Sequence, residues 1–187
     1  MLDEINNSIH ILEKGGIILY PTDTIWGIGC DATNSAAIEK IFQIKKRNES
    51  KSLIILVSDT DMLEEYVKDI PEIAFDLIKS IEKPTTIIYP EAKNLPSNVI
   101  APDKSIAVRI VNDDFCRQLV TLFGKPIVST SANISGEQAP LMFSKISEKI
   151  IQSVDYIIKI EQEKIKQLMP STIIKLDRNG EYTVIRE

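Results

Sequence analysis

The chain has 187 residues, of which 27 are acidic and 22 are basic, so its formal net charge is −5. Hydrophobic residues make up 43% and charged residues 26%, as in ordinary globular domains. A protein that binds nucleic acid mainly through bulk charge is expected to be basic, so the acidic balance argues against that class. There is no apolar run of the roughly 18 residues that a membrane span needs, and the acidic start does not resemble a secretory signal. With only two cysteines, a disulfide framework is excluded, and we expect a cytoplasmic protein.

Hydrophobic periodicity alternates along the chain between the helical and the strand period. The expected helices cover 2–14, 34–46, 59–66, 71–81, 113–123 and 143–152. The expected strands cover 17–20, 53–57, 85–89, 105–111, 126–130, 154–160, 171–176 and 182–186. Asn34 or Ser35 is expected to cap the second helix, and Asn179-Gly180 is expected to turn the last two strands into a hairpin.

This alternation predicts an α/β protein with a mixed sheet. No linker, repeat or low-complexity tract divides the sequence, so we expect residues 1–187 to form a single domain. The loops over 90–104 and 135–142 contain proline or glycine and are long enough to cover a site.

Several common chemistries are excluded by what the sequence lacks. His10 is the only histidine and lies in the expected first helix, which argues against a catalytic triad and against a histidine-based metal site. Cys30 and Cys116 lack C-x-x-C spacing and are expected to be packing residues. The sequence contains neither a G-x-x-x-x-G-K-[ST] phosphate loop nor a G-x-G-x-x-G dinucleotide turn.

The remaining polar chemistry consists of hydroxyls, an amide and cations near the ends of expected strands. The clusters cover 21–24, 45–47 with Lys51, 129–133 and 170–172. Such groups suit anion binding and phosphoryl or nucleotidyl transfer, which depend on positioning and charge neutralisation. Each cluster also has an ordinary interpretation, as a turn, a helix end or a strand terminus. Arg109 interrupts an apolar strand and is either an edge-strand charge or a ligand clamp.

Taken in order, these clusters resemble the YrdC-like (TsaC-type) threonylcarbamoyl-AMP synthase family. Residues 15–31, GGIILYPTDTIWGIGCD, are similar to the opening motif of that family. Residues 44–47, IKKR, followed by Lys51, match its K-x-R segment, and residues 129–136, STSANISG, match its S-x-N segment. Each motif alone is modest evidence for the family, whereas all of them in this order are specific to it. The resemblance extends from Gly15 to Arg186.

The resemblance implies a single YrdC-like domain, a twisted mixed sheet with flanking helices and an open, concave, basic groove. It implies an enzyme that forms threonylcarbamoyl-AMP and pyrophosphate from L-threonine, bicarbonate and ATP, with Mg²⁺ accompanying the ATP and no metal ligand assigned to the protein. The product would pass to partner proteins that modify a tRNA adenosine. Asp23 and Asp31 are candidate metal ligands only because they lie near the first motif.

Site residues are carried over from the family position by position. Four resemble its signature residues at the nucleotide, here assigned as catalytic: Lys45, Arg47, Ser131 and Asn133. ATP contacts are expected from Arg47, Lys51, Ser105, Ser131, Asn133 and Arg186, and threonine contacts from Thr24, Arg109, Ser129 and Ser171. Lys45 and Arg47 would offset phosphate charge, and Arg109 would bind the threonine carboxylate.

The sequence departs from the family at several positions. Leu56 stands where some members have a histidine that assists threonine binding, and Asn48 stands where many have proline. Two other functions stay open. One is a non-synthase paralogue that binds RNA in the basic groove, and weak RNA binding beside catalysis is also open. The other is a carbamoyl transferase that uses carbamoyl phosphate, which the missing acylphosphatase and zinc-finger-like regions argue against.

Overall fold

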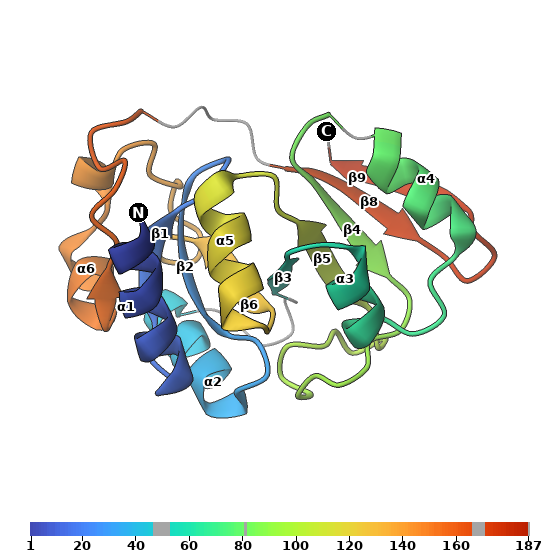
Figure 1. The fold of residues 1–187 in the computed structure, drawn as a ribbon, viewed down its shortest axis with the longest axis horizontal. Coiled ribbons are helices and arrows are strands. Elements are labelled where there is room, and N and C mark those ends of the chain that lie inside the picture. Colours follow the sequence, from blue (N-terminus) through green and yellow to red (C-terminus); the bar gives the residue numbers. More distant parts are fainter. Residues whose placement is uncertain (47–52, 81, 166–170, 187) are drawn as a thin grey trace.

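The structure, a computed structural model, describes residues 1–46, 53–80, 82–165 and 171–186 (Figure 1). Its helices are α1 (Leu2–Glu13), α2 (Ser35–Lys45), α3 (Thr60–Tyr66), α4 (Glu72–Ser80), α5 (Asp114–Phe123), the 3₁₀ turn η1 (Phe143–Lys145) and α6 (Glu148–Ser153). Its strands are β1 (Ile18–Pro21), β2 (Trp26–Asp31), β3 (Ile54–Val57), β4 (Thr85–Tyr89), β5 (Ile106–Ile110), β6 (Ile127–Ser131), β7 (Tyr156–Ile157), β8 (Thr172–Leu176) and β9 (Tyr182–Arg186).

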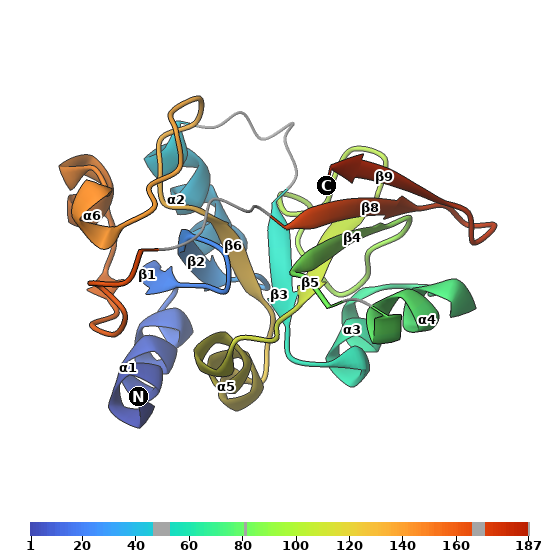
Figure 2. The ribbon, with the colours of Figure 1, turned by 90° about the horizontal axis from the view of Figure 1, so that it is seen from above.

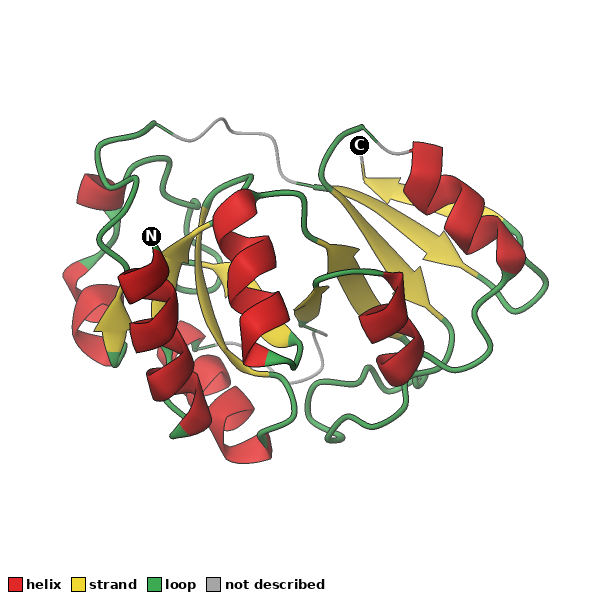
Figure 3. Cartoon of the chain, in the orientation of Figure 1, coloured by secondary structure: helices red, strands yellow, loops and turns green. Residues whose placement is uncertain are grey.

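Within these ranges the strands form one mixed sheet in the order β7-β1-β2-β6-β3-β5-β4-β8-β9. The pairs β1–β7, β3–β5 and β4–β8 are parallel, and the other neighbouring pairs are antiparallel. Figure 3 shows the twisted sheet running through the molecule with helices packed against it. The expected α/β class with a twisted mixed sheet and flanking helices is confirmed.

Two apolar clusters hold the helices to the sheet. One contains Ile38 and Phe42 of α2 packed with Trp26 and Ile28 of β2. The other joins α1 and α5 to the sheet through residues that include Leu12, Phe115, Tyr20 and Leu56. Figure 2 shows α1 and α5 on one side of the β1–β2–β6 part of the sheet and α2 and α6 on the other. In the described part of the chain, no helix has both the length and the apolarity for a bilayer crossing.

Local sequence signals explain most element ends. The side chain of Asn34 accepts a hydrogen bond from the Ala37 backbone N–H, so Asn34 and not Ser35 is the N-cap of α2. Asp59 and Asp113 cap α3 and α5 in the same way. The hairpin between β8 and β9 turns at Gly180, whose φ of +83° is accessible to glycine at little cost.

Three expectations differ from the structure. Strand β2 was not predicted, because its two glycines weaken the local strand signal and its pairing with β1 and β6 is long-range. The helix expected over 143–152 is divided into η1 and α6, since the Ser147 side chain accepts from Ile150 N and starts a new helix. The strand expected over 154–160 is only Tyr156–Ile157, which is the extent of its pairing with β1.

Close contact between β2 and β6 depends on Gly29. A Cβ at this position would collide with the carbonyl oxygen of Val128 and would lie 2.9 Å from Tyr20 Cε1. Gly27, two residues earlier on β2, is less confined, because its Cβ would come no closer than 3.4 Å to its neighbours. Gly29 therefore fixes the spacing of the central strands.

We predict that Gly29→Ala lowers the free energy of unfolding by about 1–3 kcal/mol, because the added methyl group must push backbone apart. Gly27→Ala is the matched control and is expected to cost less than about 1 kcal/mol, since its methyl group meets ordinary van der Waals contacts. Urea-induced unfolding of both variants measures the difference. Equal unfolding midpoints would contradict the assigned role of Gly29.

Candidate active site

A cavity of about 320 Å³ lies on one face of the sheet. Its lining residues come mainly from the β1–β2 turn and from β2, β6, β3, β5, β4 and β8: Thr22, Thr24, Ile25, Gly27, Leu53, Ile54, Thr86, Ile88, Ala107, Arg109, Ser129, Thr130, Ser131, Ser171, Ile173 and Arg186. The volume is in the range of small-molecule sites.

Strand alternation explains how these side chains meet. Successive side chains of a strand point to opposite faces, so residues two apart share a face. Ala107 and Arg109 on β5 are such a pair, and Ser129 and Ser131 on β6 are another. Because Ile54 is in register with both Ser129 and Ala107, the two pairs are placed on the same face.

The turn between β1 and β2 brings a threonine hydroxyl to the cavity. Thr22 Oγ1 donates to Ile25 O at 2.6 Å and accepts from the backbone N–H groups of Thr24 and Ile25 at 3.1 and 3.2 Å. These bonds close the turn, and the Thr24 hydroxyl lies 3.1 Å from that of Thr22. Thr24, assigned to threonine binding, therefore lies in a turn fixed by its own neighbours.

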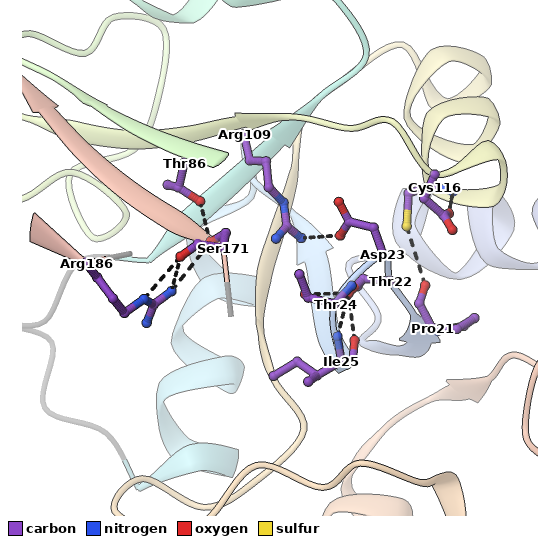
Figure 4. A network of polar contacts seen from close by, with 11 residues as sticks. Pro21, Thr22, Asp23, Thr24, Ile25, Thr86, Arg109, Cys116, Ser171 and Arg186 are labelled. Carbon is purple, nitrogen blue, oxygen red and sulfur yellow. Dashed lines mark hydrogen bonds and ion pairs between the residues drawn. The ribbon is translucent and has the colours of Figure 1, made fainter. Parts of the chain in front are cut away.

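Arg109 presents a buried guanidinium to the cavity. The residue is 5% exposed, and its Nη2 lies 3.3 Å from Oδ1 of Asp23 (Figure 4). Neither Arg109 Nε nor Asp23 Oδ1 has a hydrogen-bond partner among the described residues, so the pair is an ion pair without a well-aligned hydrogen bond. A charged guanidinium that lines a cavity and has no aligned hydrogen bond to its counter-ion is suited to bind a carboxylate.

The opposite wall of the cavity carries Ser171, Thr86 and Arg186. The hydroxyls of Thr86 and Ser171 are 2.9 Å apart, and Arg186 donates to Ser171 O from Nε at 3.1 Å and from Nη2 at 2.7 Å (Figure 4). Partial burial and then the positive charge of Arg109 lower the pKa of the Arg186 guanidinium. The two arginines therefore repel each other across the cavity, and a bound anion would relieve that repulsion.

Lys45 occupies a different position from the other site residues. It is 2% exposed at the end of α2, and its Nζ donates to the carbonyl oxygens of Ser131 at 2.6 Å and Asn133 at 2.7 Å. The Lys45 carbonyl in turn accepts from Ser135 N at 2.8 Å. Lys45 thus fixes the backbone that follows β6, and it is not among the cavity-lining residues.

Asn133 and Ser105 also lie outside the cavity lining. Asn133 Nδ2 donates to the carbonyl oxygens of Ile134 and Glu137, which folds the loop after β6 around the amide. Its Oδ1 is buried and has no hydrogen-bond partner in the described ranges. The Ser105 hydroxyl donates to Asp103 Oδ1. Arg47 and Lys51, both assigned to ATP, lie outside the described residues.

Three polar cavity residues were given no role from the sequence, Thr22, Thr86 and Thr130. Thr22 belongs to the first motif, but only the folded turn shows that its hydroxyl organises Thr24. Thr86 is fully buried as the second of two threonines that open β4, so no local signal separates it from Thr85. Leu56, in register with Arg109, packs into the apolar cluster under α1 and α5.

The cavity lining offers few groups that could bind a metal ion. Among the described residues, no three His, Cys, Asp or Glu side chains gather as a metal site, and none of the cavity-lining residues is a carboxylate. Asp31 binds Thr33 through Oδ1 and Lys125 through Oδ2, and Asp23 faces Arg109. The described cavity is therefore suited to an anion rather than to a bare cation.

The family model described as "Telomere recombination", for Sua5, YciO and YrdC proteins, matches residues 10–187. The chain belongs to the Sua5/YciO/YrdC family. A curated relative from Pseudoalteromonas translucida, named threonylcarbamoyl-AMP synthase, is 35% identical over 169 residues, which cover 89% of this chain and 89% of the relative. This degree of similarity confirms the family that the sequence motifs indicated.

Two solved structures share the fold of this family member. Escherichia coli YciO is 26% identical with a TM-score of 0.86, and the match covers 100% of this chain and 90% of YciO. P. abyssi Sua5, solved in complex with L-threonine, is 28% identical with a TM-score of 0.83. That match covers 92% of this chain and 50% of the Sua5 chain, so this chain spans about half the length of Sua5.

We predict that Lys45→Met destabilises the fold by about 1–3 kcal/mol, because two carbonyl oxygens lose a charged donor while the aliphatic packing is kept. The control is Lys46→Met, since Lys46 is the exposed neighbour at the end of α2. Thermal and urea unfolding measure the difference. If Lys45→Met is as stable as the control, the two hydrogen bonds do not stabilise the segment after β6.

Proposed function

We propose that this protein is an L-threonylcarbamoyladenylate synthase, which forms threonylcarbamoyl-AMP and pyrophosphate from L-threonine, bicarbonate and ATP. The observation that carries the proposal is the cavity itself, in which the buried Arg109 guanidinium is surrounded by hydroxyls and faced by a second arginine. This set of groups matches a hydroxylated amino acid next to a phosphate. The curated relative named threonylcarbamoyl-AMP synthase and the Sua5–threonine complex support the same function.

The threonine end of the cavity is assigned to Arg109 and three hydroxyls. Arg109 would bind the α-carboxylate through its available N–H groups. The hydroxyls of Thr24, Ser129 and Ser171 line the same cavity and would contact the amine and the side-chain hydroxyl. A buried polar partner for that hydroxyl disfavours analogues that lack it, because the partner would be left unpaired.

The nucleotide end is assigned to the segment after β6 and to cations around it. Ser131 and Arg186 line the cavity, and Asn133 follows on the backbone that Lys45 holds. Lys45 would thus act on the nucleotide through the 131–133 backbone. Arg47 and Lys51, which follow α2 in the sequence, are proposed to bind the phosphates, and Ser105 remains a proposed ATP contact on the strength of the family resemblance.

The proposed reaction has two steps. The threonine amine first attacks the carbon of bicarbonate and, with loss of water, forms a carbamate. A carbamate oxygen then attacks the α-phosphorus of ATP as the bond to the pyrophosphate oxygen breaks, and pyrophosphate leaves. Positioning the two substrates and neutralising phosphate charge are the main contributions that these residues can make.

Mg²⁺ would enter with ATP and offset charge on the phosphates. The described lining residues include no carboxylate, which fits a cation held mainly by phosphate oxygens. The cationic and hydroxyl side chains of the cavity would then bind the substrate oxygens that Mg²⁺ leaves exposed.

We further propose a cytoplasmic enzyme whose product passes to partner proteins that modify a tRNA adenosine. Both cysteines are buried free thiols, which is consistent with a reducing compartment. A mixed anhydride of a carbamate and a phosphate is prone to hydrolysis, so a nearby acceptor protein would use it efficiently.

The test is pyrophosphate release by the purified chain in the presence of ATP, Mg²⁺ and bicarbonate, with L-threonine, with L-serine or with neither. We expect release that depends on L-threonine and is poorly supported by L-serine. No release from a folded, nucleotide-bound protein would contradict the proposal. Salt-sensitive RNA binding in that same preparation would instead favour the RNA-binding paralogue.

We predict that Ser131→Ala lowers turnover at least about tenfold, because a hydrogen bond to a charged phosphate is lost while the backbone held by Lys45 is kept. Arg47→Ala is expected to act in the same direction. Ser153→Ala is the control, since its hydroxyl bonds only within the sequence-local backbone of α6, at Lys149 O. Steady-state pyrophosphate assays beside circular dichroism separate lost turnover from lost fold, and full activity of Ser131→Ala would refute its placement.

A further inference from the structure

Asp23 is a charged residue next to the cavity that the proposed reaction leaves without a role. It lies on the β1–β2 turn between Thr22 and Thr24, yet it is absent from the residues that line the main cavity. Its carboxylate faces Arg109, with side-chain exposures of 15% for Asp23 and 6% for Arg109. Asp23 also lines a second, smaller cavity of about 50 Å³, together with Lys83 and Asn112. The carboxylate therefore contacts the guanidinium without lining the main cavity.

The geometry of this ion pair leaves the arginine competent to bind. The 3.3 Å contact between Arg109 Nη2 and Asp23 Oδ1 lacks the alignment of a hydrogen bond, and Arg109 Nε has no hydrogen-bond partner in the described part of the chain. Asp23 thus offsets the charge of the guanidinium and attracts it without engaging it in an aligned hydrogen bond. A bidentate hydrogen bond would instead have occupied the groups that a substrate carboxylate needs.

The turn that carries Asp23 is itself held in place. Thr22 closes it with three hydrogen bonds to Thr24 and Ile25, and the thiol of Cys116 on α5 donates to Pro21 O at 3.4 Å. A carboxylate on a fixed turn can define the direction of a long arginine side chain.

We infer that Asp23 is a positioning residue, which holds the Arg109 guanidinium in the orientation that binds the α-carboxylate of the amino acid substrate. The inference rests on the proposed function. Asp23 touches neither substrate and takes no proton. Its effect is confined to the affinity for the amino acid, since Arg109 and not Asp23 faces the cavity.

The test compares Asp23→Asn, which keeps the shape and removes the charge, with Asp23→Glu, which keeps the charge. We expect Asp23→Asn to raise KM for L-threonine about tenfold, with kcat and KM for ATP changed less than about threefold. Asp23→Glu is expected to recover part of the threonine affinity. Calorimetric titration of L-threonine into each variant gives the same comparison without relying on turnover.

Asp31→Asn is the matched control, because Asp31 also forms a partly buried ion pair on β2, with Lys125 at 3.1 Å, outside the cavity. It is expected to lower stability without changing KM for threonine. In an Arg109→Gln background, Asp23→Asn is expected to change KM for L-threonine little further, since both substitutions act through the same guanidinium. If Asp23→Asn unfolds, Asp23→Ser, which also removes the charge, takes its place: a raised KM for threonine is expected, and a KM equal to that of wild type would count against the inference.

Two results would overturn the inference. One is an unchanged KM for threonine in Asp23→Asn, which would make the pair purely structural. The other is a lower KM, which would mean that Asp23 only weakens the attraction of Arg109 for anions. An inactive wild type that also fails to bind threonine would instead defeat the proposed function, so the two failures are distinguishable.

Discussion

The register of the central strands is the constraint on which the site depends. Six strands, β2, β6, β3, β5, β4 and β8, are neighbours in the sheet and place alternate side chains on one face. A shift of one residue in any of these pairings would turn its polar side chains into the apolar core. The close approach of β2 to β6 at Gly29 holds this register at one end of the row. The cavity is thus a property of the sheet more than of any loop.

The three described cations at the site, Lys45, Arg109 and Arg186, have different partners. The ammonium of Lys45 donates hydrogen bonds to two backbone carbonyl oxygens and holds the segment after β6 in place. The charge of the Arg109 guanidinium is balanced by the Asp23 carboxylate, and the Arg186 guanidinium donates from the last strand to the Ser171 carbonyl oxygen. A chain with a net charge of −5 therefore concentrates cations around one cavity. Local charge, and not the total, is what suits the protein to anionic substrates.

The fold alone would not select a function within this family. YciO covers the whole chain with a TM-score of 0.86, yet its identity is only 26%. The hydroxyls and arginines of the cavity carry more information than the sheet, because they must match the substrate atom by atom. Thr24, Ser129 and Ser171 come from three distant segments of the chain and line one cavity together with Arg109.

The sequence by itself determined the α/β class, nearly all helices and strands and the family motifs, because these follow from local periodicity and residue order. It narrowed the cap of α2 to Asn34 or Ser35. Only the tertiary structure showed which strands pair and which residues far apart in the sequence come into contact. Strand β2 exists through pairing with β1 and β6, and Thr86 joins the site because β4 lies between β5 and β8. It also decided that Lys45 faces carbonyl oxygens and that Asp23 faces Arg109, 86 residues further along the chain. Such pairings depend on which strands become neighbours, and that choice is made by burial across the whole sheet.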